Sequence, residues 1–209
     1  GVICQNASFI DISNCTFEVP VSTLPISTTF SDVSLEMYNR PTGIYMQNSS
    51  GFYIYDNEFS KAITKLTGNP ICSNCNQAIV LDATTPGFEA DGGNGLVMNN
   101  IFEEVNIGVL AQNGNGTETG FGSYVAGNGV SVVCNEFKDL VSYDLALTIV
   151  PSSQAQGQRP IRDQGYCANI PNHLEYDYPA LNTYNPCIGQ TRNVHNESAS
   201  FDYYHAVNN

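Results

Sequence analysis

Cys72 and Cys75 form a Cys-x-x-Cys pair, a spacing that serves redox chemistry, zinc binding or disulfide formation. A redox pair needs a helix N-terminus that favours the thiolate, whereas this pair follows Gly68-Asn69-Pro70 and precedes a β-rich run. A zinc site needs two further ligands at suitable spacing. We therefore expect a structural disulfide here, or two cysteines that pair with different partners.

The other cysteines indicate an oxidising setting. Seven cysteines in 209 residues, together with few charged residues, are typical of extracytoplasmic proteins. We predict that Cys167 pairs with Cys187, which would close a loop of about 20 residues and contribute roughly 3 kcal/mol. Cys15 and Cys134 have near-equivalent places in a repeat, either as buried thiols or in disulfides. The odd count leaves one thiol free or paired outside this chain.

Asp82, Glu89 and Asp91 are acidic residues that could gather near one loop. Carboxylate oxygens are the ligands that Ca²⁺ prefers, so these residues are a candidate calcium site. The alternative is a solvated acidic loop. No other cofactor is predicted.

Tyr45, Tyr53 and Tyr55 alternate with apolar residues in β-rich runs. Alternation points Tyr53 and Tyr55 to the side opposite Ile54. An outward row of tyrosines could stack on sugar rings, because an aromatic face offers apolar area beside a polar hydroxyl. The alternative is cross-strand packing beneath the segment at residues 18–42.

The charge balance narrows the range of partners. Seven Lys and Arg against 20 Asp and Glu give a net charge of −13, which argues against binding to nucleic-acid phosphates or anionic membranes. No apolar run reaches the roughly 18–20 residues of a membrane span, so no membrane insertion is predicted. His173, His195 and His205 match no familiar metal-ligand spacing.

One short phrase recurs and determines the predicted fold. It is a β-rich run, then small polar residues, one further residue and Phe, with Asn two positions before Phe in three copies. In the first copy Cys15 takes that place and Asn14 precedes it. The copies lie at residues 9–17, 52–59, 96–102 and 130–137.

The spacing of the repeated Phe predicts a stack of short coils. Steps of 42, 43 and 35 residues are too long for one coil, and apolar runs at 43–46, 78–81, 107–110 and 145–149 would be the intervening coils. Each coil would hold roughly 20 residues. The Phe side chains and the corner Asn amides would stack from coil to coil, around a core that includes Ile10, Ile12, Ile54, Val97 and Val132.

The four phrases resemble the right-handed parallel β-helix repeat family over about residues 1–150. The resemblance implies an all-β, right-handed parallel β-helix. It implies no single activity, since this fold hosts lyases, hydrolases and adhesins. We expect coils at 1–150 with excursions at 18–42 and 111–129. An irregular tail at 151–209, rich in Cys, Tyr and Pro, would pack on the last coils.

The layout also resembles secreted surface proteins of the Bacteroidetes type, whose β-helix modules precede sorting domains of the type IX secretion system. A sorting domain is absent from this sequence, and its first 17 residues already have the pattern of a coil. We therefore expect a fragment of a larger protein, or a partner that covers the first coil.

The expected function is a non-catalytic module of a secreted or cell-surface protein, acting as a rigid stalk or an adhesive, glycan-binding surface. Its partner would be a polysaccharide, a cell-envelope component or other domains of the same protein. No catalytic residues are predicted, because the Asn-Thr-Asp, Asp-Asp, Gly-His-Gly and Arg-Ile-Lys motifs of polygalacturonase-like enzymes are absent. The alternatives are a polysaccharide lyase or glycoside hydrolase whose catalytic coils are missing, and a cargo bound to its outer-membrane secretion machinery.

Overall fold

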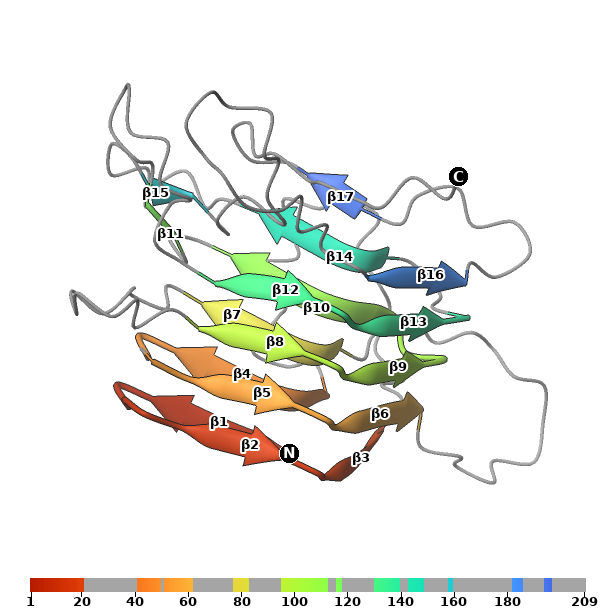
Figure 1. The fold of residues 1–209 in the computed structure, drawn as a ribbon, viewed down its shortest axis with the longest axis horizontal. Helices are drawn as coiled ribbons and strands as arrows, with labels where there is room; N and C mark the ends of the chain where they lie inside the picture. The colour runs from red at the N-terminus through yellow and green to blue at the C-terminus, as the bar shows by residue number, and fades with distance from the viewer. Residues whose placement is uncertain are drawn as a thin grey trace, which may run out of the picture.

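The computed structural model of the chain consists of short strands in parallel sheets (Figure 1). It describes residues 1–20, 41–49, 51–61, 77–82, 95–112, 116–117, 130–139, 143–148, 158–159, 182–185 and 194–196. Every regular element among these residues is a strand, which confirms the prediction of an all-β protein with parallel sheets.

Three parallel sheets hold most of the strands. Sheet 1 contains, in order, β1 (Val2–Gln5), β4 (Thr42–Gln47), β7 (Gln77–Asp82), β10 (Ile107–Gln112), β14 (Tyr143–Thr148) and β17 (Val194–Asn196). Sheet 2 contains β2 (Asp11–Ser13), β5 (Tyr53–Tyr55), β8 (Leu96–Met98) and β12 (Ser131–Val133). Sheet 3 contains β3 (Thr16–Val19), β6 (Glu58–Lys61), β9 (Ile101–Glu103), β13 (Glu136–Lys138) and β16 (Thr183–Asn185). A separate antiparallel pair joins β11 (Gly116–Thr117) to β15 (Gln158–Arg159).

The chain visits the three sheets in a fixed order. It passes from sheet 1 to sheet 2 to sheet 3 and then returns to sheet 1, one strand further along. We call one such passage a rung. The first three rungs are β1–β3, β4–β6 and β7–β9, the fourth is β10, β12 and β13, and the fifth includes β14 and β16. The last described strand of sheet 1, β17, pairs with β14.

The predicted coil of about 20 residues is wrong. Phe17 is paired directly with Phe59, and Phe59 with Phe102, so neighbouring rungs are a full Phe-to-Phe step apart. The apolar runs that we assigned to intervening coils form sheet 1, which is another face of the same rungs. The physical reason is that an inward-facing strand is apolar whether it belongs to a new coil or to another side of the same coil.

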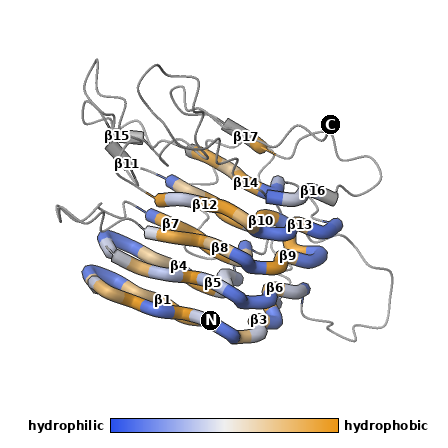
Figure 2. Tube along the Cα trace, in the orientation of Figure 1, coloured by the Kyte–Doolittle hydropathy of each residue, from blue (hydrophilic) through white to orange (hydrophobic). Residues whose placement is uncertain are grey.

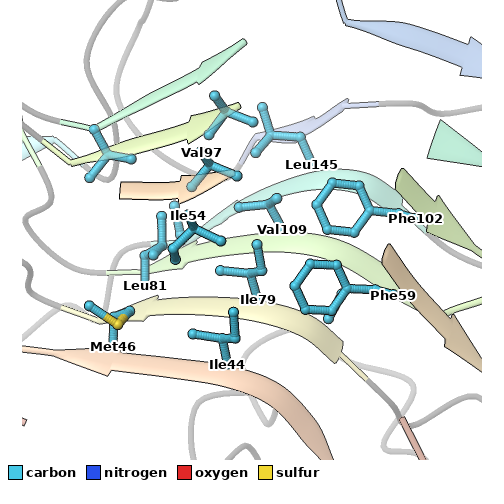
Figure 3. Close-up of a cluster of buried hydrophobic side chains, with 14 of the residues drawn as sticks. Ile44, Met46, Ile54, Phe59, Ile79, Leu81, Val97, Phe102, Val109 and Leu145 are labelled. Atoms are coloured by element: carbon cyan, nitrogen blue, oxygen red, sulfur yellow. The ribbon is translucent and has the colours of Figure 1, made fainter. Parts of the chain in front are cut away.

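Alternation along the strands builds the core. Ile12, Ile54, Val97 and Val132 occupy one register position of sheet 2 and are buried, as predicted, while Ile10 is only partly buried. Figure 3 shows Ile44, Ile79, Val109 and Leu145 from sheet 1 beside Ile54 and Val97 from sheet 2, with Phe59 and Phe102 from sheet 3. Hydrophobic colouring runs along β10 and β14 in Figure 2, because these strands are buried on both faces.

The repeated Phe side chains form the predicted aromatic stack. Successive ring centroids from Phe17 through Phe59, Phe102 and Phe137 lie 4.8, 5.2 and 4.8 Å apart, with nearly parallel planes. Tyr184 adds a fifth ring, 5.3 Å from Phe137. This spacing matches the ~4.8 Å distance between neighbouring strands, so each ring stacks on the ring of the next rung.

The predicted hydrogen bonding of corner amides from coil to coil is present, and it forms a ladder. Each Asn side chain in it hydrogen-bonds to the backbone of the rung before its own. The Oδ1 atom of Asn100 accepts hydrogen bonds from the backbone N–H of Asn57 (3.1 Å) and from its Nδ2 (3.0 Å). The Nδ2 of Asn100 donates to the carbonyl oxygen of Ile54 (2.9 Å). The same pattern recurs at Asn57, Asn135 and Asn182.

The residue before each ladder position turns the chain. Asn14, Asp56, Asn99 and Cys134 all have a φ between 54° and 56°. This left-handed conformation is one that Asn and Asp tolerate better than most residues. Cys15 therefore holds the ladder position, whereas Cys134 holds the turn position, so the two cysteines are offset by one residue rather than equivalent. The backbone N–H of Cys15 still donates to Asn57 Oδ1 (3.0 Å), because the ladder bond comes from the following rung.

The repeat continues past residue 150, although the sequence predicts an irregular tail from residue 151. Two strands from the tail join the large sheets in register, with Tyr184 opposite Phe137 and Val194 opposite Leu145. Within the excursion at 111–129, β11 pairs with β15, while residues 111–112 belong to β10. Most of the excursion at 18–42 lies outside the described residues.

Replacement of Asn100 by Ala should destabilise the fold strongly. The change leaves the Asn57 N–H and the Ile54 carbonyl without their buried partner. Each buried unsatisfied group costs about 1–3 kcal/mol, so we expect a loss of about 3 kcal/mol in the free energy of unfolding, measured by urea denaturation. The exposed Glu103→Ala on the same rung is the control and should change stability by less than about 0.5 kcal/mol. Equal stability of the two variants would contradict the ladder's role.

Candidate binding surface

The outer face of sheet 2 carries a strip of aromatic and aliphatic side chains. Because Ile12, Ile54 and Val97 point into the core, the residues on either side of each point outward. One outward row is Asp11, Tyr53, Leu96 and Ser131, and the other is Ser13, Tyr55, Met98 and Val133. We call these eight residues the sheet 2 strip.

The centre of the strip is apolar and partly open to solvent, whereas Ser131 at one end is buried. Tyr53 is 48% exposed, and Tyr55, Leu96 and Met98 are each partly exposed. The hydroxyl of Tyr55 donates to Asp11 Oδ2 at 3.3 Å, a contact between neighbouring rungs. Parallel pairing places neighbouring side chains about 4.8 Å apart, so the strip is a flat platform whose rows run across the rungs.

Tyr45 does not belong to this strip. It lies on β4 in sheet 1, where it packs against a buried cluster that includes Val80, Leu110 and Ala146. Its hydroxyl donates to Asp82 Oδ2 at 2.8 Å. The structure thus brings together two of the three tyrosines predicted to bind sugars, and it places the third on another face, in a packing role.

Asp82 is the one residue of the candidate calcium site that the structure describes. Its side chain is 3% exposed and also accepts a hydrogen bond from Gln47 Nε2 at 3.1 Å. Glu89 and Asp91 lie outside the described residues. In the described part of the chain, no three His, Cys, Asp or Glu side chains come close enough together to hold a metal ion.

The cysteines that the structure describes are free thiols. Cys4 and Cys134 are both partly buried, and burial raises the pKa of the Cys4 thiol. Cys15 is exposed, and its Sγ donates to the carbonyl oxygen of Ser13 at 3.2 Å. The four cysteines predicted to form disulfides, Cys72, Cys75, Cys167 and Cys187, all lie outside the described residues.

Acidic side chains flank the strip. Glu58 and Glu136 share one outward row of sheet 3, and Asp56 is exposed at the turn between the two sheets. Lys138 is paired with Glu136 at 3.0 Å, so its charge is compensated locally. The strip is therefore an apolar platform beside negative charge.

Sequence reasoning missed Leu96, Met98 and Val133 as parts of this surface. The signal was present in the repeated phrase, because the outward positions lie six and four residues before each Phe. Counting back from Phe102 gives Leu96 and Met98, which are the register partners of Tyr53 and Tyr55. The predicted alternation named the tyrosines but did not extend the rows to the next rungs.

Comparison with protein-family models, curated proteins and solved structures gave no significant match. No helix in the described ranges has the length and apolar character needed to cross a membrane. Function must therefore be inferred from the residues of this chain and their geometry.

Proposed function

We propose that this chain is a non-catalytic, right-handed parallel β-helix module of a secreted or cell-surface protein, and that the sheet 2 strip binds a neutral polysaccharide. The observation that carries the proposal is the partly exposed platform of Tyr53, Tyr55, Leu96 and Met98 across two paired rungs. The raised cysteine count and low charge support an extracytoplasmic location.

The β-helix assignment is supported by the repeated passage through three parallel sheets. A strand that returns to the same sheet in parallel does so by a crossover, and such crossovers are right-handed in about 98% of cases. The aromatic stack and the amide ladder hold successive rungs in register. A stack held in this way is stiff along its axis, which suits a stalk that presents a binding face.

The choice of a sugar ligand follows from the chemistry of the strip. Tyrosine faces supply apolar area for the C–H face of a sugar ring, and their hydroxyls supply hydrogen bonds at its edge. The choice of a neutral polymer follows from charge, since Asp11, Asp56 and Glu58 would repel polyuronates. A chain lying across the rungs would contact Tyr53 and then Leu96, or Tyr55 and then Met98.

Substitution of Tyr53 should weaken binding without unfolding the protein. We expect Tyr53→Ala to lower affinity for a neutral polysaccharide such as a xylan or β-glucan by roughly tenfold, the loss of about 1.4 kcal/mol of stacking, measured by affinity electrophoresis or calorimetry. Tyr53→Phe keeps the ring face and should retain most of the affinity. Thr16→Ala, on the exposed outer face of sheet 3, is the matched control and should bind like the unsubstituted chain.

Two results would contradict the assignment of this site. One is equal affinity of Tyr53→Ala and the unsubstituted chain. The other is tighter binding to polygalacturonate than to neutral polymers at low salt, because negative charge should weaken that complex.

The module should bind polysaccharide without cleaving it. Incubation with the bound neutral polymer should release no new reducing ends in a reducing-sugar assay, and incubation with polygalacturonate should release no unsaturated oligosaccharides, as measured by their absorbance. Release that disappears with a substitution in the described rungs would identify this chain as an enzyme and would refute the non-catalytic assignment.

A further inference from the structure

Asp144 occupies a corner position that small residues fill in earlier rungs. Along sheet 1 the aligned residues are Gly43, Ala78, Gly108 and Asp144. A Cβ added at Gly43 would come within 3.0 Å of the Phe59 ring, and one added at Gly108 within 2.6 Å of the Phe137 ring. The position therefore faces the aromatic stack, where there is little room for a side chain.

The carboxyl group of Asp144 is buried with one oxygen unpartnered. The residue is 2% exposed, and its Oδ2 atom has no hydrogen-bond partner. Burial of an unpaired polar group in an apolar setting is costly, and burial of its charged form costs more. Burial accordingly raises the pKa of Asp144 from 3.8 to about 7.

Neither β14 nor the two strands paired with it, β10 and β17, carries a Lys or Arg. The neighbouring strand β10 contains no titratable residue. On β13, Glu136 and Lys138 lie on the outer face and pair with each other. The remaining titratable residues of the packed strands are Tyr143 on β14 itself, Tyr184 on β16 and His195 on β17, which is opposite Ala146 in the register.

We propose that the protonation state of Asp144 controls the attachment of β16 and β17 to the preceding rungs. Both strands stay paired with those rungs when Asp144 is protonated, and their pairing weakens when it is ionised. In its neutral form the side chain can remain in the apolar corner, level with the Tyr184 ring of its own rung. In its ionised form it must acquire water, and the nearest way to admit water is to separate β16 from β13 and β17 from β14. Opening would expose the strand edges of β13 and β14, a surface able to pair with another strand.

The direction of the pH dependence follows from the raised pKa. Between pH 3.8 and about 7 the folded state keeps a proton that the unfolded state has lost. Protonated Asp144 therefore stabilises the folded state fully in acid. This contribution is lost progressively as the pH rises through the interval, and it changes little at higher pH. An ordinary surface carboxylate held by a positive partner gives the opposite trend, since it loses stability in acid.

Hydrogen exchange measured on the whole chain from pH 5 to 8.5 tests whether Asp144 controls the attachment of β16 and β17. After correction for intrinsic exchange rates, protection of the backbone amides of β16 and β17 should fall at least tenfold between pH 5 and 8, while that of β8 and β9 changes much less. Asp144→Asn should abolish the pH dependence. Asp144→Ala introduces the residue that stands at the aligned position 78, and it should also abolish the pH dependence. This variant provides the test if Asp144→Asn does not fold. Asp139→Asn, at an exposed acid, is the matched control and should behave like the unsubstituted chain.

The proposal is overturned if β16 and β17 show the same pH profile in the unsubstituted chain and in Asp144→Ala. It is also overturned if protection falls equally in all rungs, because that would indicate global rather than local opening.

Discussion

The structure depends on a ladder of buried amides that runs along the corner between sheets 2 and 3. Each ladder Asn accepts a backbone N–H and donates to a backbone carbonyl of the rung before it, as Asn100 does for Asn57 and Ile54. The Asn57 N–H lies beyond the end of β5, so the amide satisfies it inside the protein, and the same amide also binds the Ile54 carbonyl of that strand. Because one misplaced rung would leave several of these groups unpaired, the ladder fixes the register. The aromatic stack two residues later, and the outward rows of sheet 2 before it, inherit that register.

The repeated phrase predicted local features well and the length of a rung badly. Asn two residues before Phe was enough to predict both the amide ladder and the ring stack, since both are properties of one corner. The rung length required knowing that residues such as Ile44 and Ile79 line another side of the same rung. Both arrangements bury the same apolar residues, so hydrophobicity could not distinguish them. The rung of Tyr184 was missed because Tyr replaces Phe, although Asn182 stands at the ladder position two residues earlier.

The candidate site was predictable in part, for the same reason. Alternation around Ile54 placed Tyr53 and Tyr55 on one outward face without further information. The grouping of Tyr45 with them required the relation between two sheets, and in the structure its hydroxyl is bound to Asp82 in sheet 1 instead. Asp144 gave no signal in the sequence, because its strand has an ordinary β-rich pattern. Its significance appears only when it is aligned with Gly43, Ala78 and Gly108 beneath the rings.

Disulfide cross-linking of neighbouring rungs tests most directly that each Phe-to-Phe step is one rung. Strands about 4.8 Å apart bring paired residues within disulfide range, whereas a separation of two rungs does not. In a Tyr55→Cys, Met98→Cys double variant the two introduced thiols should form a disulfide in high yield, identified by peptide mass mapping, and those of Tyr55→Cys, Val133→Cys should not. Failure of the first pair, with both variants folded, would mean that another coil separates these strands and would contradict the account.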